Sequence, residues 1–430
     1  METIMDQNRS EWLEKQILDR FVRYVRIETT SDRHGEQIPS TPGQWDLLRL
    51  LVSELEELGI EEIELDGHGY LIARLPSNIE GKSENQVIGF LAHVDTSAEA
   101  SGKDVKPQLH HNYDGSIIEL KDGITLDPGE FPDLLRYKGE TIITADGTTL
   151  LGADDKAGIA EIMAAVAWLR EHPDIPHGTI EIIFTPDEET GKGLLQFPIE
   201  KLCSGYCYTI DGDGKGIIEA ECFYGYKAVV KLKGVNIHPG KGRGKLMNAV
   251  TMASQFVTML PRNESPEATD GRFGFYLPIE LTGTSSQASL EIYLRDFDYN
   301  EIERRTDALR KIATVVEAQF PGGKVTVETE KQYVNMRDFI SKDPRGIEYL
   351  KEAIKTVGLT PVEKIIRGGT DGARLSEQGI PTPNVFTGGA NYHGEREWIV
   401  VSLMVKTSET IIELAKRWAG ADVQTGTKNR

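Results

Sequence analysis

Short apolar runs alternate with amphipathic helical stretches through the first 225 residues, and this alternation limits the fold more than any other feature of the sequence. In Lys156–His172, for example, apolar residues recur at the spacing of one buried helix face. Helices interleaved with short β-rich runs predict an α/β fold whose sheet is at least partly parallel. The other helices expected in this part are Ser10–Val25 and Gln44–Leu58, and the expected strands are Glu62–Leu65, Leu71–Leu75, Gln86–His93, Thr179–Thr185 and Tyr206–Ile210.

The pattern changes from about Tyr226 onward. The expected elements are then Lys227–Leu232, Asn248–Leu260, Gly274–Gly283, Ser289–Asp296, Tyr299–Gln319 and Lys324–Thr329. Their order, βαββαβ, is that of a ferredoxin-like split unit, which can fold as a compact insert. The α/β character resumes with Pro344–Val357, Val362–Arg367, Thr382–Thr387 and Ser402–Trp418. We therefore expect one larger domain in two pieces, residues 1–225 and 332–430, interrupted by a smaller domain of residues 226–331.

Charge and cysteine content exclude several classes of protein. Lys and Arg number 48 against 68 Asp and Glu, and the formal net charge of −20 repels nucleic acid and anionic membranes. The sequence has no run of about 18 apolar residues, so no membrane span is expected. The charged start METIMDQNRSEWLEK shows no secretory signal. Three cysteines, Cys203, Cys207 and Cys222, are too few for a disulfide framework, which favours a cytoplasmic protein. Cys203 and Cys207 lack the spacing of a zinc knuckle, so we expect both in the core.

Acidic residues and histidines follow the ends of the expected strands or precede a helix. They are His93, Asp95, Asp154, Asp155, Glu188, Glu189, Asp211 and His393. In open α/β sheets, ligands bind beyond the carboxyl ends of the strands. Taken alone, the acidic pair before Lys156 could be a helix cap, and the pair after Thr185 could be a solvated loop. Together, such acids at buried strand ends repel one another unless a cation holds them. Two histidines with several carboxylates match the ligand preferences of zinc, cobalt or manganese.

Seven segments resemble the peptidase T group of the M20 metallopeptidase family in order and spacing. They are HVDTS, LLGADDKAG, FTPDEETGKG, YTIDG, GVNIHPG, RGGTDGARLS and FTGGANYHGEREW. The resemblance extends from FVRYVRIETTS to the last expected helix, so it covers nearly the whole chain. It implies a zinc-peptidase-like catalytic domain, with a mixed sheet and helices on both faces, interrupted by a lid domain. It also implies a cytoplasmic aminopeptidase that releases the N-terminal residue from short peptides, preferably tripeptides.

The same resemblance assigns roles to residues of the expected metal site. It makes Asp154 the carboxylate that bridges two zinc ions, for which cobalt or manganese could substitute. The remaining ligands would be His93 and Asp211 at one ion and Glu189 and His393 at the other. Asp95 would fix the tautomer of the first histidine. Glu188 would be the general base for attack by a hydroxide bridged between the two zinc ions. The resemblance further implies a cis peptide bond between Asp154 and Asp155.

Contacts with the peptide substrate are implied in the lid. His238 in VNIHPG would stabilise the oxyanion, and Arg295 in LRDFD would bind a substrate carboxylate; pairing of that arginine with Asp296 is the alternative. Asn236 and Asn335 would be secondary contacts. Metal ligands in one domain and substrate contacts in another imply hinge closure. The lid could also form a homodimer contact, as in several relatives.

Two departures from the peptidase T pattern fall beside the expected substrate cleft. Where the group usually has a Gly-rich stretch followed by an Asn-containing strand, this chain has GDGKGIIEAECFYGY. Leu277 stands where the group tends to have His. Both leave a strict preference for tripeptides open.

The nearest alternative is another M20-type amidohydrolase, a dipeptidase or an N-acyl amino acid hydrolase, because the reaction at the carbonyl is the same. A non-catalytic relative is disfavoured, since all five expected ligands and Glu188 are present. Nucleotide binding is disfavoured too, because GKGRGK lacks the ending of a phosphate loop.

Overall fold

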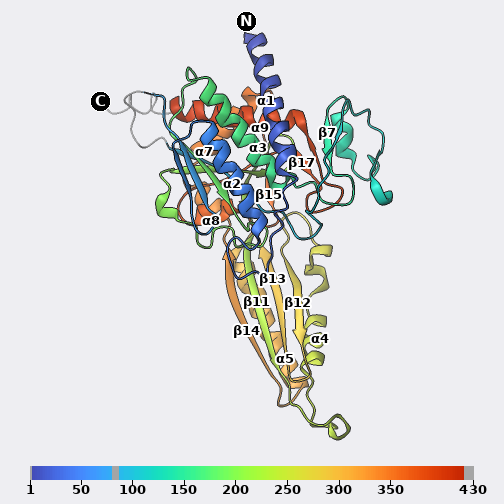
Figure 1. Cartoon of the computed structure of the whole chain (residues 1–430). Coiled ribbons are helices and arrows are strands. Elements are labelled where there is room, and N and C mark those ends of the chain that lie inside the picture. Colours follow the sequence, from blue (N-terminus) through green and yellow to red (C-terminus); the bar gives the residue numbers. More distant parts are fainter. Residues whose placement is uncertain (1, 80–86, 421–430) are drawn as a thin grey trace, which may run out of the picture. The chain divides into compact units, whose positions relative to one another are not determined.

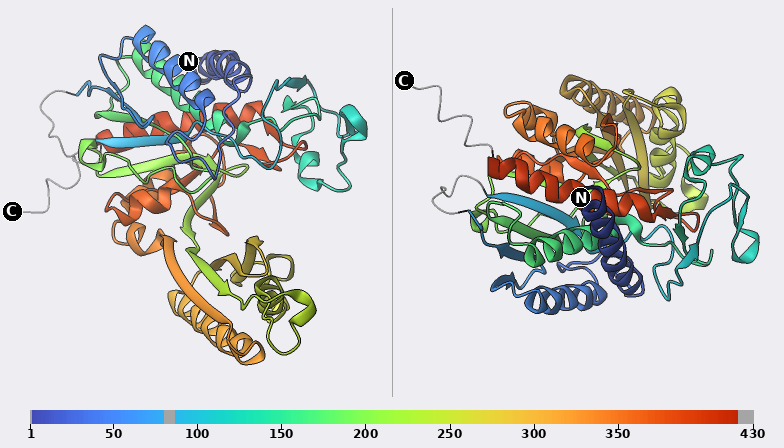
Figure 2. Two further views of the ribbon diagram at one scale, coloured as in Figure 1. Left: turned by 60° about the horizontal axis from the view of Figure 1, so that its bottom comes forward. Right: turned by 90° about the horizontal axis from the view of Figure 1, so that it is seen from above.

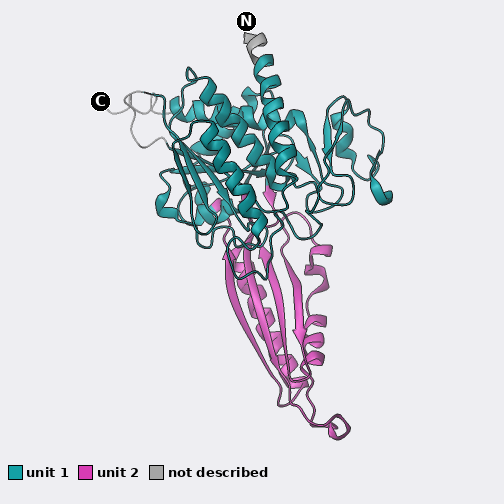
Figure 3. Cartoon of the chain, in the orientation of Figure 1, with its two compact units in different colours: residues 1–220, 338–364, 370–430 teal, residues 221–337, 365–369 magenta. Residues whose placement is uncertain are grey.

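The computed structural model describes residues 2–79 and 87–420 (Figure 1). The chain forms two compact units (Figure 3). Unit 1 comprises Met1–Ala220, Asp338–Lys364 and Thr370–Arg430, and unit 2 comprises Glu221–Arg337 and Ile365–Gly369. Within the described ranges, no helix combines the length and the apolar character needed to cross a membrane.

The main sheet of unit 1 is mixed. Among the described residues it has eight strands in the order β1-β2-β8-β3-β9-β16-β10-β15. Strand β3 is parallel to both β8 and β9, and β9 is parallel to β16, whereas β2 and β10 pair antiparallel with their neighbours β8 and β16. Every residue of β3 and β8 is buried, which explains why both strands are rich in apolar residues. The strands are β1 Glu62–Leu65, β2 Leu71–Leu75, β3 Ile88–His93, β8 Ile180–Thr185, β9 Tyr206–Gly212, β10 Ile217–Cys222, β15 Val362–Ile366 and β16 Asn384–Phe386.

Helices cover both faces of this sheet, as the family resemblance implied (Figure 2). On one face, Leu375 of α8 packs in a buried cluster with Leu91 and Cys207 from neighbouring strands. On the other face, Tyr208 of β9 stacks against Phe90 and accepts a hydrogen bond from the indole N–H of Trp418 in α9. The helices are α1 Glu2–Tyr24, α2 Pro42–Glu57, α3 Ala153–Glu171, α6 Arg337–Ile340, α7 Arg345–Thr356, α8 Asp371–Glu377 and α9 Val401–Gly420.

A second, smaller sheet in unit 1 was not expected from the sequence. Its order is β17-β18-β7-β4, and a separate hairpin joins β5 to β6. The strands are two or three residues long, so they carry no readable alternation of apolar and polar residues. Buried apolar side chains beneath them include Leu126, Ile142 and Trp398. The bounds are β4 Gln108–His110, β5 Ile118–Glu119, β6 Thr125–Leu126, β7 Ile142–Thr144, β17 Gly389–Ala390 and β18 Trp398–Val400.

Unit 2 has the predicted element order βαββαβ. Its antiparallel sheet has the strand order β12-β13-β11-β14. Apolar residues at alternate positions, such as Val230 of β11 and Ile292 of β13, form a core with Phe256 of α4 and Leu309 of α5. The period of two in the strands therefore matches a sheet with helices against one face. The elements are β11 Tyr224–Lys233, α4 Ala249–Thr258, β12 Phe275–Gly283, β13 Gln287–Asp296, α5 Tyr299–Gln319 and β14 Lys324–Tyr333.

Some local predictions need correction. Strand β3 begins at Ile88 rather than at Gln86, which lies outside the described residues. Cys207 and Cys222 are buried, but Cys203 is exposed, so its prediction as a core residue is wrong. The reason is that Cys203 precedes β9 in a loop, where its backbone amide donates to the carboxylate of Glu181. Strand β10 and helix α8 were not expected either.

Candidate metal centre

The candidate centre lies at the carboxyl ends of three parallel strands of unit 1. His93 ends β3, Glu188 and Glu189 follow β8, and Asp211 lies near the end of β9. Because parallel strands end at the same edge of a sheet, these side chains meet there. Asp154 at the start of α3 joins them, together with His393 from the turn between β17 and β18. Two groups of possible ligand atoms result, each within 4.8 Å of one another: His93, Asp154 and Asp211, and Asp154, Glu189 and His393.

His93 presents one ring nitrogen to the carboxylates and holds the other against Asp95. Its Nε2 lies 2.9 Å from Asp154 Oδ1 and 3.6 Å from Asp211 Oδ1. Its Nδ1 lies 3.1 Å from the carbonyl oxygen of Asp95 and 3.3 Å from its Oδ1. Burial alone would lower the pKa of His93, but the bonds to these aspartates outweigh it and raise the pKa well above its ordinary value. An imidazole fixed in this way through its second nitrogen is typical of metal ligands.

His393 has the matching arrangement on the other side of Asp154. Its Nε2 lies 3.2 Å from Asp154 Oδ2 and 3.0 Å from Glu189 Oε1, while Nδ1 lies 3.1 Å from Glu99 Oε2. Burial opposes protonation of this imidazole, but Asp154 and Glu189 raise its pKa to about 12. Each carboxylate oxygen of Asp154 thus faces a different histidine, which is the arrangement that a bridging carboxylate needs.

The turn that carries Asp154 is held by Glu397, which the sequence interpretation passed over. Its carboxylate accepts hydrogen bonds from the backbone amides of Leu151, Gly152 and Asp154, at 2.7, 2.8 and 3.1 Å. Glu397 is only 1% exposed, and burial raises its pKa to about 7. The peptide bond between Asp154 and Asp155 is cis. The only signal for Glu397 in the sequence is its place four residues after His393 in YHGEREW.

Asp95 also orders the loop after β8. Its Oδ1 accepts from the backbone amide of Glu188 at 2.9 Å, and its Oδ2 accepts from that of Glu189 at 3.2 Å. Burial raises the pKa of Glu188 well above its ordinary value; His93 opposes the shift, and the charge of Asp371 adds to it. Asp371 was not among the predicted residues. It begins α8 and accepts a bond of 2.7 Å from the hydroxyl of Thr185.

The donor set fits two divalent cations. Each group offers one imidazole nitrogen and two carboxylates, and the two groups share Asp154. Nitrogen and oxygen ligands of this kind suit zinc, cobalt and manganese. The second nitrogens of both histidines already have acceptors, so their Nε2 atoms are free to coordinate.

Replacing Asp95 by Asn is expected to weaken divalent metal binding by roughly 10- to 100-fold, because the second nitrogen of His93 loses its charged acceptor. Competition titration of zinc against a chelator would measure the change. Asp19→Asn, at an exposed position of α1, serves as the control. An affinity within about twofold of the unchanged protein would rule out this role for Asp95.

Two of the predicted substrate residues lie at one end of the sheet of unit 2. Arg295 is 8% exposed, and its Nη1 donates to the carbonyl oxygens of Tyr226 and Leu294. Its guanidinium also lies over the rings of Tyr293 and Tyr333, whereas Asp296 is paired with Arg305. Asn335 is fully buried nearby, and its Oδ1 accepts from the amides of Cys222 and Arg337.

The other two predicted residues lie beyond the opposite end of that sheet. Asn236 and His238 follow Lys233, the last residue of β11, which pairs with Gln287. Arg295 instead pairs with Gly225, the second residue of β11. Eight residues of strand separate these ends, which corresponds to roughly 26 Å. A tripeptide spans only about 10 Å when extended. Within one chain, a tripeptide is therefore too short to reach both pairs of residues at once.

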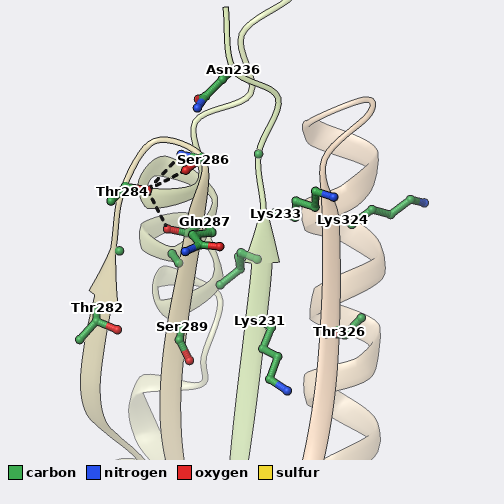
Figure 4. Close-up of a pocket in the computed structure, with 14 residues that line it drawn as sticks. Lys231, Lys233, Asn236, Thr282, Thr284, Ser286, Gln287, Ser289, Lys324 and Thr326 are labelled. Atoms are coloured by element: carbon green, nitrogen blue, oxygen red, sulfur yellow. Dashed lines mark hydrogen bonds between the residues drawn. The ribbon is translucent and has the colours of Figure 1, made fainter.

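Asn236 borders a groove of about 920 Å³ on unit 2 (Figure 4). The hydroxyl of Thr284 lies there within hydrogen-bond distance of Ser286 and of the carbonyl oxygen of Gln287. Three lysines contribute to the lining: Lys231, Lys233 and Lys324. Lys231 is paired with Glu328.

Comparisons with known proteins agree with this architecture. Residues 142–417 match peptidase family M20/M25/M40. Peptidase T from Geobacillus sp. (strain WCH70) is 45% identical over 406 residues, which are 94% of this chain and 98% of the relative. Peptidase T from Clostridium perfringens is 44% identical over 405 residues, 94% of this chain and 99% of the relative. The crystal structure of aminopeptidase PepT from Bacillus cereus has a TM-score of 0.70 at 25% identity, covering 94% of this chain and 99% of that one. A tripeptidase structure from Staphylococcus aureus has a TM-score of 0.72 at 21% identity, with coverages of 95% and 99%.

Proposed function

The chain belongs to peptidase family M20/M25/M40 and, within it, to the peptidase T group; from this premise we propose how its residues release the N-terminal residue of a tripeptide. The observation that carries the proposal is Asp154, whose two carboxylate oxygens face two histidines in two ligand groups. Residues 1–225 and 332–430 would form the catalytic domain and residues 226–331 the lid. The division of the chain into two compact units supports this assignment.

In the proposed mechanism, the two ligand groups would hold two zinc ions, for which cobalt or manganese could substitute. His93 and Asp211 would hold one ion, Glu189 and His393 would hold the other, and Asp154 would belong to both groups. When bound, such ions supply Lewis acidity, which polarises the scissile carbonyl and acidifies the attacking water. The buried turn fixed by Glu397 keeps the shared carboxylate in place before substrate arrives.

Glu188 is the proposed general base. It accepts the proton of the attacking water and then gives it to the leaving amine. Its backbone amide is held by Asp95, which also holds Nδ1 of His93. One carboxylate therefore fixes the base and a ligand relative to each other, which limits reorganisation during the reaction.

For the lid, the proposal rests on the family resemblance. Arg295 binds the substrate carboxylate with Asn335 beside it, and His238 stabilises the oxyanion with Asn236 as a further contact. Within one chain, these two pairs lie at opposite ends of strand β11. Both pairs can therefore reach a single tripeptide only when one copy of the chain supplies one pair and a second copy supplies the other. A homodimer is therefore part of the proposal. The low cysteine content supports a cytoplasmic location.

Hydrolysis of matched di-, tri- and tetrapeptides tests this function. The metal-loaded protein is expected to cleave the free tripeptide at its first bond and to lose this activity after chelation. Addition of zinc or cobalt should restore it. An N-acetylated tripeptide and a C-terminally amidated one serve as controls for recognition of the two ends. Faster cleavage of the acetylated peptide or of a dipeptide would favour an N-acyl amino acid hydrolase or a dipeptidase of the same family instead.

A further inference from the structure

The residue before the proposed general base has a backbone conformation that side chains rarely adopt. Asp187 has φ of 56° and is fully buried. Non-glycine residues occupy this left-handed region infrequently, although aspartate tolerates it better than most, and they persist there when surrounding contacts over-determine them. Because Glu188 follows directly, the conformation of Asp187 decides the direction in which Glu188 leaves the strand.

Contacts from the start of helix α2 hold Asp187 in this conformation. Gln44 is fully buried, and its Nε2 donates to Asp187 Oδ1 at 2.8 Å. Its Oε1 accepts from the backbone amide of Asp187 at 3.1 Å. One side-chain amide thus binds both the carboxylate and the backbone of the same residue. Ser40 adds its backbone amide, 2.7 Å from Asp187 Oδ2, and its hydroxyl, which donates to Oδ1.

The loop is also held from its other side. The amides of Glu188 and Glu189 donate to Asp95. Three consecutive backbone amides, those of residues 187 to 189, therefore each donate to a side-chain oxygen of another element. Rotation of the loop about Asp187 would break the contacts of Gln44 first, because they involve the residue whose φ must change.

We propose that Gln44 is a positioning residue for Glu188. Through its reciprocal pair with Asp187, assisted by Ser40, it fixes the left-handed turn that aims the carboxylate of Glu188 at the attacking water. This inference rests on the proposed role of Glu188, although the contacts themselves do not. The inference adds the start of α2, which is 143 residues away from Asp187 in the sequence, to the parts of the chain that set the reaction rate.

The principal test is Gln44→Leu in the full-length, zinc-loaded protein. We expect kcat for the tripeptide to fall roughly 10- to 100-fold, because displacements of about 1 Å at a catalytic group cost this much. KM should stay within about twofold and zinc content should not change, since no ligand is altered. Hydrogen exchange at the amides of residues 187 to 189 should become faster. If Gln44 had only a structural role, its replacement would lower the melting temperature without lowering kcat at constant KM.

Two controls make the result specific. Leu51→Val removes a buried methylene from the same helix and should lower the melting temperature while leaving kcat within about twofold. The double variant Gln44→Glu with Asp187→Asn exchanges the acid and the amide, so that the side chain at position 187 can donate to the one at position 44. The double variant should recover most of the kcat that Gln44→Glu and Asp187→Asn each lose alone.

Ser40→Ala covers the case in which Gln44→Leu does not fold. It removes one hydroxyl donor and leaves the backbone donor, and a loss of about threefold to tenfold in kcat is expected. Unchanged kcat in a folded, zinc-loaded Gln44→Leu protein, or in Ser40→Ala if only that variant folds, would overturn the inference while leaving the proposed function intact. If Glu188→Gln itself retained activity, the proposed base and this inference would fail together.

Discussion

Replacing Glu188 by Gln is expected to lower kcat for a tripeptide by about 10²- to 10⁴-fold while the bound zinc stays unchanged. The amide keeps the shape of the side chain but cannot take a proton from the attacking water. The five proposed ligands are untouched, and the backbone amide of Glu188 still donates to Asp95. Steady-state kinetics together with metal analysis of the same preparation would measure both quantities.

The matched control for this variant is Glu395→Gln. Glu395 is an exposed acid two residues after His393, so its loss removes the same charge close to the site in the sequence. Its kcat should remain within about twofold. If Glu188→Gln kept a substantial part of the activity, another group would have to serve as the base. A loss of zinc in Glu188→Gln would instead mean that Glu188 helps to hold the ions.

Replacing Asp154 by Asn should have the largest effect on metal binding. Asp154 faces Nε2 of both histidines, so the loss of its charge removes a ligand from both groups at once. We expect the affinity for both ions to fall by more than the 10- to 100-fold typical of partners outside the ligand set. Peptidase activity should fall by at least about 10³-fold at micromolar zinc. Titration of the chelated protein with zinc or cobalt would follow both sites.

Asp174→Asn is the appropriate comparison, because Asp174 is an exposed acid just beyond the other end of helix α3. It should bind metal as the unchanged protein does. Retention of two tightly bound ions by Asp154→Asn would contradict a shared carboxylate. Selective loss of one ion would show that Asp154 serves a single site.

The sequence predicted the part of the centre that lies on regular structure. His93, Glu188 and Asp211 could be found because each lies at or just after the end of a buried strand, and parallel strands bring their ends to one edge. The fold class was predicted from the same pattern, because strands such as β3 and β8 are wholly buried and rich in apolar residues. The two units likewise contain elements close to their expected bounds, for example α5 at Tyr299–Gln319.

What the sequence could not supply depends on contacts between distant segments. Strand β18 is three residues long and pairs with β7, which lies roughly 255 residues earlier in the sequence, so no local pattern predicts it. Glu397 and Gln44 appear as ordinary polar residues, because their importance comes from the backbone amides that they bind. The separation of His238 from Arg295 could be seen only once the register of β11 against β13 was known.

The position of β16 in the main sheet has a consequence for biosynthesis. This strand lies between β9 and β10, yet it is made roughly 175 residues after the part of β9 that it pairs with. At translation rates of about 5 to 20 residues per second, roughly 10 to 35 s pass between synthesis of β9 and synthesis of β16, and the edge of β9 lacks this partner during that time. His393 emerges only after that strand. A nascent chain that stalls within unit 2 therefore carries an open strand edge and four of the five proposed metal ligands, a state that favours aggregation and premature binding of metal.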